Sequence, residues 1–325
     1  MIIAYKTAKR TVNKTTYRAV KTAPRLNSFV ICSVVAFVMV IAYPLREALA
    51  QERYSPFVPS DMSNVERMVS LARLRPGDVV VDLGSGDGRI VFASLRADPK
   101  VTGWGVELDA ALVEKTNAAA QVQGFANRAE FFHRNAFDAD LSRVDVIYMW
   151  LWTEVQQMLR SKILAEARPG TRVVTNLWGM GAWQPDEIDS EVSPVNLWVV
   201  PARVEGNWSW ELTLRGVKRD YSAMLERHFQ KLEGVARIGN RRVIASDMRL
   251  RGEDVFFSLS MTVDGLGYAR HEFSGKMRGD TIEGSAKVLL VSDKDDDKQD
   301  LIELPWRAVR TIAAGYLAPT GTNAP

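Results

Sequence analysis

The feature that most constrains this chain is a strand that runs directly into a glycine-rich turn. The segment 79–91 reads Val-Val-Val-Asp-Leu-Gly-Ser-Gly-Asp-Gly-Arg-Ile-Val. Its β-branched apolar residues predict a buried strand, and the residues after Gly88 are compatible with a helix. Glycines in such a turn adopt positive φ and have no Cβ atom, so backbone N–H groups and a helix N-terminus can approach a ligand closely. This strand–turn–helix unit therefore predicts a ligand site.

Two acidic residues indicate which ligand the turn binds. Dinucleotide sites favour the spacing G-x-G-x-x-G, whereas the glycines here are spaced G-x-G-x-G. Asp82 precedes the first glycine by two residues, and its carboxylate would repel a pyrophosphate but attract an ammonium or a sulfonium. Glu107, at the end of the next predicted strand, is placed to bind ribose hydroxyls. We therefore expect S-adenosylmethionine as the cofactor. The alternatives are an NAD-dependent oxidoreductase, which this spacing disfavours, and an ordinary tight turn.

Residues of the glycine turn and of the strand ends around it are predicted to contact the cofactor. Backbone groups of the turn would meet its amino-acid portion, and Asp82 would hold its ammonium directly or through water. In the segment 134–138, Asn135 would bond to the adenine amine while Ala136 and Phe137 line the ring. The alternative for Asn135 is a turn residue at a strand end. The predicted cofactor-binding residues are Asp82, Gly84, Gly86, Glu107, Asn135 and Ala136.

Strands alternate with helical segments in the first part of the chain. This alternation predicts an α/β, Rossmann-like domain with a mostly parallel sheet covered on both faces. Ligands of such sheets lie beyond the carboxyl ends of the strands. A capping box at Ser63 and Glu66 predicts the start of a preceding helix that ends near Leu74. The predicted strands are 78–83, 101–106, 129–133, 144–151 and 171–177, and the predicted helices are 87–96, 110–123 and 154–167.

The pattern changes near Pro201, after which short alternating runs are separated by turns. This rhythm predicts a C-terminal antiparallel all-β domain, either a meander or a partial barrel. The acidic run 293–300 predicts a solvated hairpin loop, because its spacing does not fit an EF-hand calcium site. The expected organisation is a basic tail 1–28, a hydrophobic signal or anchor segment 29–50, a cofactor-binding domain 51–203, a β-rich domain 204–312 and a tail 313–325.

The N-terminal segment indicates contact with a membrane. The first 28 residues carry seven Lys or Arg residues and no acid, and residues 29–43 are uncharged and apolar. Together with the Ala48-Leu-Ala50 site, this pattern resembles a secretory signal peptide. The apolar run is short for a spanning helix, but with its flank to Ala50 it could anchor. The positive-inside rule would place the chain after Gln51 outside, where the cofactor is not expected, so cleavage and the side of the membrane stay open.

Charge and residue content limit the partners and the kinds of site that this chain can have. A net charge of +3 gives no indication of a nucleic-acid-binding protein. The single cysteine, Cys32, lies in the apolar segment, and the three histidines are widely spaced in sequence. We therefore predict no metal site and no disulfide.

Aromatic residues follow the predicted fourth and fifth strands, where this sheet would meet a methyl acceptor. Such rings could hold a methylammonium or an aliphatic side chain. The alternative is that the tryptophans pack beneath the second domain, and that Glu154 is a first-turn acid favoured by the helix dipole. No catalytic residue is assigned. The candidates for the substrate rim are Tyr54, Phe57, Trp150, Trp152, Glu154 and Asn176.

Three segments together resemble a known family of class I methyltransferases. They are 54–59 (Tyr-Ser-Pro-Phe-Val-Pro), 82–91 and 105–109 (Gly-Val-Glu-Leu-Asp). The family includes membrane-anchored, mitochondrial protein-lysine methyltransferases that act on the ATP synthase c subunit and the adenine nucleotide translocase. The resemblance covers roughly residues 54–202. The chain differs from the eukaryotic members in its β domain and in its Trp-rich strand ends. It resembles more closely the bacterial members that have an appended β domain.

The resemblance implies a function for the chain. It implies S-adenosylmethionine as the cofactor and a lysine amine of a protein as the acceptor. It also implies that the segment 54–59 folds over the cofactor or frames the lysine channel. The alternative is a non-catalytic envelope or binding protein that retains a methyltransferase-like scaffold.

Overall fold

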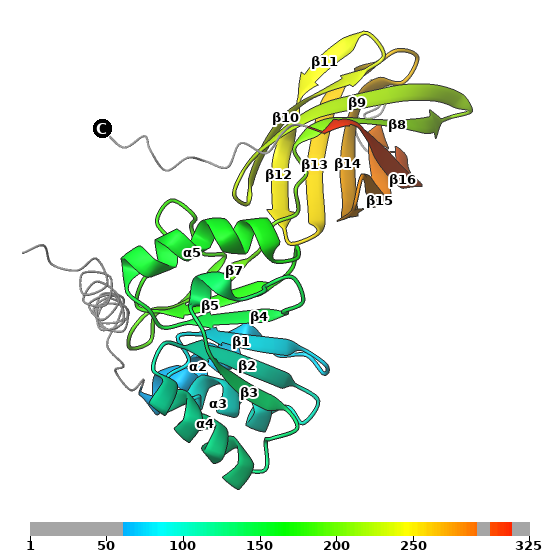
Figure 1. Ribbon diagram of the computed structural model, residues 1–325. Helices are drawn as coiled ribbons and strands as arrows, with labels where there is room; N and C mark the ends of the chain where they lie inside the picture. The colour runs from blue at the N-terminus through cyan, green and yellow to red at the C-terminus, as the bar shows by residue number, and fades with distance from the viewer. Residues whose placement is uncertain (1–60, 291–299, 314–325) are drawn as a thin grey trace, which may run out of the picture. The chain divides into compact units, whose positions relative to one another are not determined.

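A computed structural model describes residues 61–290 and 300–313 of the chain (Figure 1). Contacts between residues divide the chain into two units, Met1–Arg53 and Tyr54–Pro325, and every described residue belongs to the second. Several predicted segments lie outside the described residues: 1–28, 29–50, 54–59, most of the loop 293–300, and the tail 313–325 apart from its first residue. None of the helices described is both long enough and apolar enough to cross a membrane.

The first sheet has seven strands in the order β3-β2-β1-β4-β5-β7-β6. Neighbouring strands from β3 to β5 are parallel, and β7 is antiparallel to both β5 and β6. The predicted α/β, Rossmann-like fold is therefore confirmed. The strands are β1 (Val79–Leu83), β2 (Thr102–Glu107), β3 (Ala129–His133), β4 (Val146–Met149), β5 (Arg172–Asn176), β6 (Glu187–Asp189) and β7 (Val195–Val199).

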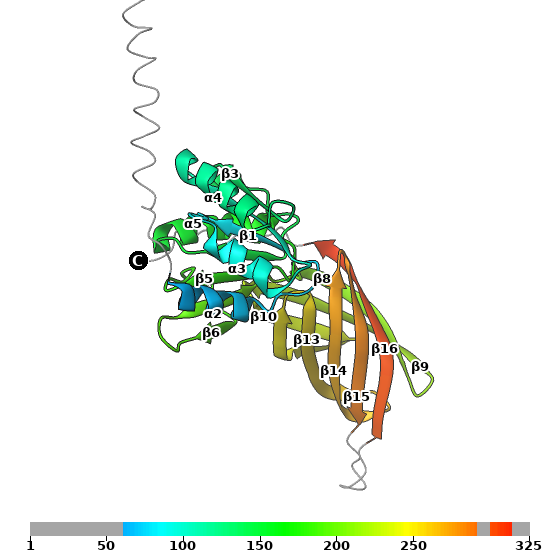
Figure 2. The same ribbon diagram turned by 90° about the horizontal axis from the view of Figure 1, so that it is seen from below.

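Helices cover both faces of this sheet. Those that follow β1 and β2 pack with α2 on one face, against a core that includes Val80, Phe92 and Tyr148 (Figure 2). The opposite face packs against α5 through Leu159 and Ile163. The helices are α2 (Met62–Ala72), α3 (Arg89–Ala97), α4 (Ala110–Val122) and α5 (Thr153–Glu166), with a 3-10 turn η1 (Ala136–Asp138).

Two predicted helix starts are wrong. The residue that caps α2 is Asp61, whose carboxylate accepts a hydrogen bond from Ser63 N at 2.8 Å. Asp caps a helix as well as Ser does, so the predicted capping box at Ser63 gives way to the earlier acid. Helix α3 begins at Arg89 rather than at Asp87, because Gly88 before it has a left-handed φ of 75° that a helix cannot include.

The strand order places β1 at the centre of the site. Connections from β1 lead toward β2 on one side, while β4 pairs with β1 on the other. Such a reversal leaves a crevice at the carboxyl ends of the strands, where ligands of open α/β sheets bind. Asp82 lies beside Gly105 of β2 and Tyr148 of β4 in the sheet register. The end of β1 is therefore at the switch point.

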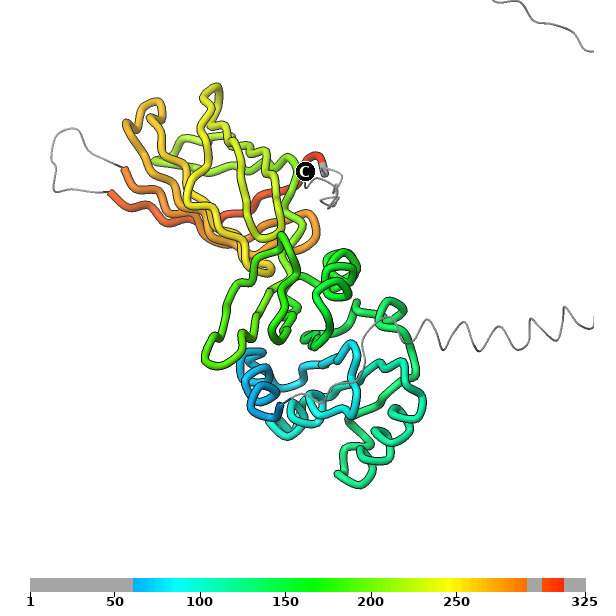
Figure 3. Tube along the Cα trace, turned by 90° about the vertical axis from the view of Figure 1, so that its left-hand side faces the viewer, coloured from blue at the N-terminus to red at the C-terminus, as the bar shows by residue number. Residues whose placement is uncertain are grey.

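The second sheet has nine antiparallel strands, as predicted for the C-terminal domain, in the order β11-β10-β9-β8-β16-β15-β14-β13-β12. It curls so that β10 contacts β12, and Ala245 N donates to Gly234 O at 3.0 Å (Figure 3). Rings of Trp210, Phe273 and Trp306 fill its interior. The strands are β8 (Gly206–Leu214), β9 (Val217–His228), β10 (Lys231–Ile238), β11 (Arg241–Ile244), β12 (Ser246–Arg251), β13 (Asp254–Val263), β14 (Gly267–Arg278), β15 (Thr281–Leu290) and β16 (Asp300–Ala313).

Candidate functional site

The glycine turn is held in place by β2 and α4. Its three glycines, Gly84, Gly86 and Gly88, have φ values of 92°, 52° and 75°, which other residues rarely adopt. The N–H groups of Gly84 and Ser85 both donate to Val106 O at 2.9 Å. The Thr116 hydroxyl donates to Gly86 O at 3.1 Å. The turn is therefore a fixed loop, as a site that binds through backbone groups requires.

Close contacts surround the turn. A Cβ atom on Gly105 of β2 would lie 2.5 Å from Ser85 Cβ, so the turn packs directly on the bare backbone of that strand. A Cβ atom on Gly84 would lie 2.7 Å from Leu151 Cδ2. Leu151 lies between β4 and α5, and this contact places that connection beside the turn.

The surroundings of Asp82 would favour a cation bound beside its carboxyl group. Its side chain is 2% exposed, and its Oδ1 atom has no hydrogen-bond partner among the described residues. Burial raises the pKa of Asp82 to about 8, and the nearby carboxylates of Glu107 and Asp87 act in the same direction. A buried, unpaired carboxyl oxygen at the switch point fits the ammonium of S-adenosylmethionine.

Glu107 joins the turn to the end of β2. Its Oε2 atom accepts from Gly86 N at 3.0 Å, and its Oε1 atom accepts from Leu108 N at 2.7 Å and Asp109 N at 3.1 Å. The residue lies where the sequence places it, at the end of the second strand. Its bond to the turn was not foreseen, because the sequence shows no pairing between residues 21 positions apart. Its contact with ribose hydroxyls stays a prediction.

Asn135 caps a short turn. Its Oδ1 atom accepts from Phe137 N at 3.0 Å, at the start of η1. The neighbouring Arg134 N donates to Glu107 O at 3.0 Å, so this segment adjoins the end of β2. Ala136 and Phe137 are partly buried against the core under α5. Asn135 is therefore a turn residue in the structure, which was the alternative for this position. The contacts of Asn135 and Ala136 with adenine stay a prediction.

The structure separates the tryptophans of the rim into two kinds. Trp152 and Trp178 are 49% and 41% exposed, and their rings lie 6.4 Å apart between centroids with an interplanar angle of 30°. Trp150 instead packs against the core between the sheet and helices α2 and α3. Trp183 is fully buried and stacks on Phe229, which lies between β9 and β10, at 6.1 Å. Packing therefore accounts for Trp150 and Trp183 but not for the exposed pair.

Other rim candidates have different surroundings. Asn176, at the end of β5, is buried, and its Oδ1 atom accepts from Ser193 Oγ at 3.1 Å. Its Nδ2 atom has no hydrogen-bond partner among the described residues. Glu154 is exposed in the first turn of α5, as the helix-dipole alternative expects. Tyr54 and Phe57 lie outside the described residues.

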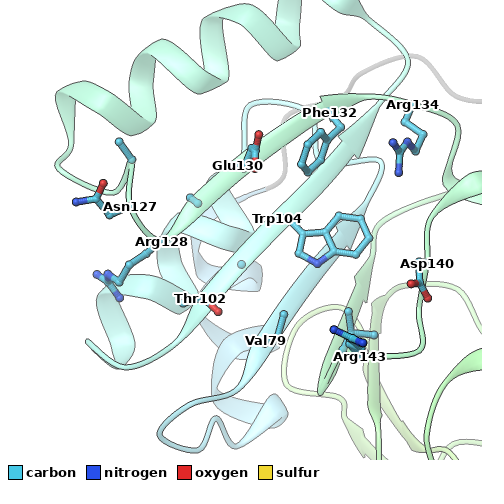
Figure 4. Close-up of a pocket in the computed structure, with 14 residues that line it drawn as sticks. Val79, Thr102, Trp104, Asn127, Arg128, Glu130, Phe132, Arg134, Asp140 and Arg143 are labelled. Atoms are coloured by element: carbon cyan, nitrogen blue, oxygen red, sulfur yellow. The ribbon is translucent and has the colours of Figure 1, made fainter.

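A separate groove of about 520 Å³ lies on the face of β1, β2 and β3 (Figure 4). Its floor includes Trp104 and Phe132, whose rings meet edge to face at 6.3 Å. Its lining extends from the starts of strands, such as Val79 and Thr102, to Phe132 and Arg134 at the end of β3. None of the predicted site residues lines it. The groove exists because the connection from β3 to β4 contains η1 in place of a helix.

Comparisons with known proteins agree with this geometry. Residues 82–187 match the model of the ANTKMT methyltransferase domain. A protein-lysine N-methyltransferase of Saccharolobus islandicus (strain REY15A) is 35% identical over 133 residues, which cover 41% of this chain and 83% of that protein. The adenine nucleotide translocase lysine N-methyltransferase of Mus musculus is 33% identical, covering 42% and 58%. The human lysine N-methyltransferase named for the c subunit of ATP synthase is 28% identical, covering 47% and 65%.

Solved structures are also similar. An RNA methyltransferase from Salinibacter ruber in complex with S-adenosyl-L-homocysteine shares 38% identity. The similarity covers 45% of this chain and 96% of that one, with a TM-score of 0.44. The animal lysine methyltransferases are matched over less than two thirds of their lengths. The family model ends at residue 187, before the first strand of the second sheet.

Proposed function

This chain belongs to the ANTKMT methyltransferase family, and we propose that its methyl acceptor is the side-chain amine of a lysine in a protein. The predictions of a methyltransferase and of S-adenosylmethionine as its cofactor are confirmed, as is the resemblance to this family. The lysine proposal is supported by the names of the relatives, which are protein-lysine N-methyltransferases from an archaeon and from animals.

The exposed pair of Trp152 and Trp178 is the observation that carries the proposal. It stands at the carboxyl ends of β4 and β5, next to Leu151, which touches the glycine turn. A methyl transfer moves positive charge from the sulfonium of the cofactor to the acceptor amine. Aromatic faces attract such a cation, and the attraction grows as water is excluded. Two stacked, solvent-accessible indoles beside the cofactor loop are therefore suited to an acceptor that becomes an ammonium.

The residues of the chain account for binding and orientation. Bound S-adenosylmethionine supplies an electrophilic methyl group on sulfur. Asp82, Glu107 and the backbone of the turn would hold the cofactor, and positioning supplies much of the rate enhancement in such a displacement. The incoming lysine must be uncharged to attack. Burial against the indoles lowers a lysine pKa, so a dedicated base is not required.

Alanine at Trp152 or Trp178 is expected to raise the KM for the protein acceptor. Loss of one cation–π and apolar contact of about 1 kcal/mol corresponds to roughly a 5-fold change. Cofactor affinity should stay within about 2-fold, since neither ring belongs to the turn. Initial rates with tritiated cofactor measure the first quantity and calorimetry measures the second. Val122→Ala, an exposed apolar residue at the end of α4, is the matched control. Unchanged KM in both tryptophan variants would remove the pair from the acceptor site.

The acceptor class itself is tested by the labelled product. Protein extract of the source cell is incubated with the enzyme and tritiated S-adenosylmethionine, and the labelled protein is hydrolysed to amino acids. We expect the label in mono-, di- or trimethyl-lysine. Label in methyl-arginine, in RNA or in a small molecule, with none in methyl-lysine, would contradict the lysine proposal while leaving the methyltransferase assignment intact.

The N-terminal segment is proposed to associate the enzyme with a membrane. The support is its sequence, a basic stretch followed by the apolar residues 29–43, and these residues lie outside those that the structure describes. A reporter fused after Gln51 distinguishes the two sides. An active cytoplasmic reporter places the catalytic domain where its cofactor is made, an active external reporter indicates export, and a fully soluble fusion would contradict the proposal.

A further inference from the structure

In the second sheet, β10 and β12 approach each other (Figure 1). A groove of about 480 Å³ lies where they meet. We call it the seam groove. Residues of β9, β10, β11 and β12 line it, and the argument uses Met224, Glu226, Glu233, Val235, Ile244 and Asp247. It belongs to the part of the chain beyond the ANTKMT match, and the methyltransferase function leaves it unused.

Three apolar side chains form a row across the seam groove. Val235 pairs with Met224 of β9 on one side and with Ile244 of β11 on the other. Their side chains are 39%, 48% and 76% exposed. On the solvent side of an antiparallel sheet, such positions are usually polar. An exposed apolar row over three neighbouring strands is typical of a surface that binds a partner.

Two carboxylates face each other in the next row. Glu226 and Glu233 are directly opposite across β9 and β10. Like charges in this position destabilise a sheet. Neither side chain makes an ion pair or a hydrogen bond with any residue that the structure describes. Asp247 adds a third acid to the lining, already paired with Arg270 at 2.9 Å, and the lining includes no Lys or Arg. The seam groove is therefore complementary to a cation.

Strand edges border the seam groove. β11 pairs with β10 only between Val235 and Ile238. Before Val235, β12 lies against that side of β10 without a strand ladder among the described residues, and Ala245 N donates to Gly234 O. β12 is an end strand, paired with β13 alone. Extended polypeptides add to such edges through backbone hydrogen bonds, with pockets selecting alternate side chains. This arrangement favours a polypeptide over a small cation.

We propose that the seam groove binds an extended polypeptide segment with an apolar and a cationic side chain two positions apart. Side chains two positions apart on a strand share one face and lie about 6.6 Å apart, the spacing between the apolar row and the glutamate row. The apolar side chain would contact Met224, Val235 and Ile244. The Lys or Arg side chain would lie between Glu226 and Glu233. The inference goes beyond the proposed function and does not rest on it, because binding here requires neither cofactor nor methyl transfer.

A labelled peptide of the sequence Val-Thr-Lys-Thr-Val-Thr-Lys tests the proposal with the full chain. Fluorescence anisotropy should show binding that weakens with added salt. Glu233→Gln and Ile244→Ser should each weaken it about 5- to 10-fold, the effect of losing one charged or one apolar contact. The matched controls are Glu114→Gln on α4 and Val217→Ser at the start of β9, both exposed and outside the seam groove. Equal melting temperatures of all variants establish that they are folded.

Three outcomes would overturn the proposal. The first is equal binding of the peptide in which both lysines are replaced by glutamate. The second is a peptide that does not bind at low salt, or that binds but is weakened equally by the seam groove variants and by the control variants. The third is concentration-dependent self-association of the full chain that Ile244→Ser abolishes, which would identify the occupant as a second copy of the chain. None of these outcomes bears on lysine methylation, so failure here is distinct from failure of the proposed function.

Discussion

Gly105→Ala is expected to weaken S-adenosylmethionine binding by one to two orders of magnitude. The new Cβ atom would lie 2.5 Å from Ser85 Cβ and 2.8 Å from Phe131 Cδ1, distances that require the neighbours to move. Ser85 cannot move alone, because its N–H and that of Gly84 are both bonded to Val106 O. Overpacking of this kind costs about 1–3 kcal/mol, and at the upper end a displaced cofactor turn loses roughly 100-fold in affinity.

Calorimetry with S-adenosylmethionine measures this effect. Gly179→Ala is the matched control, since a Cβ atom there has no heavy atom within 4 Å and the backbone φ is not left-handed. Thermal unfolding of both variants separates a displaced turn from an unfolded domain. Affinity within about 2-fold of the wild type in a folded Gly105→Ala protein would mean that the turn does not bind the cofactor.

Local patterns were sufficient to predict which strand ends and turn residues lie together at the end of β1. Asp82, the glycines and Glu107 each follow directly from a strand end, and parallel neighbours bring strand ends to one edge whatever the rest of the sheet does. The same reasoning predicted the antiparallel second domain from its alternation and turns. Errors in this part are small and local. Helix starts moved by one or two residues where Asp61 and Gly88 determine the backbone.

Contacts between distant residues could not be predicted in this way. Four tryptophans near the ends of β4 and β5 look alike in sequence, yet Trp152 and Trp178 are exposed together while Trp150 and Trp183 pack in different cores. Which of them is free depends on side chains that arrive from elsewhere, such as Phe229. The contact of Gly105 with Ser85 and the bond of Glu107 to Gly86 are of the same kind. Sequence spacing contains no information on such packing.

Asp82→Asn is expected to change how stability depends on pH. The folded protein holds the pKa of Asp82 at about 8, because burial and the carboxylates of Glu107 and Asp87 disfavour the charged form, whereas the ordinary pKa of an aspartate is 3.8. Between these values the folded state binds more protons than the unfolded state. The free energy of unfolding of the cofactor-free protein therefore falls as pH rises from about 4 to about 8. At about 1.4 kcal/mol per pKa unit, the upper bound of this loss is roughly 6 kcal/mol.

Urea unfolding of the cofactor-free wild type and of Asp82→Asn at about pH 5 and about pH 8 isolates this contribution. Other groups titrate in both proteins, so the difference between the two pH slopes belongs to Asp82. We expect the wild type to lose more stability than the variant as pH rises, by a few kcal/mol. Asp140→Asn is the control: hydrogen bonds from Ser142 hold the pKa of this exposed carboxyl below its usual value, so it is charged in both states over this pH range and its replacement should leave the pH slope unchanged. Parallel pH curves for wild type and Asp82→Asn would contradict the prediction. They would show that Asp82 is already ionised in the cofactor-free enzyme, so that cofactor binding releases no proton from it.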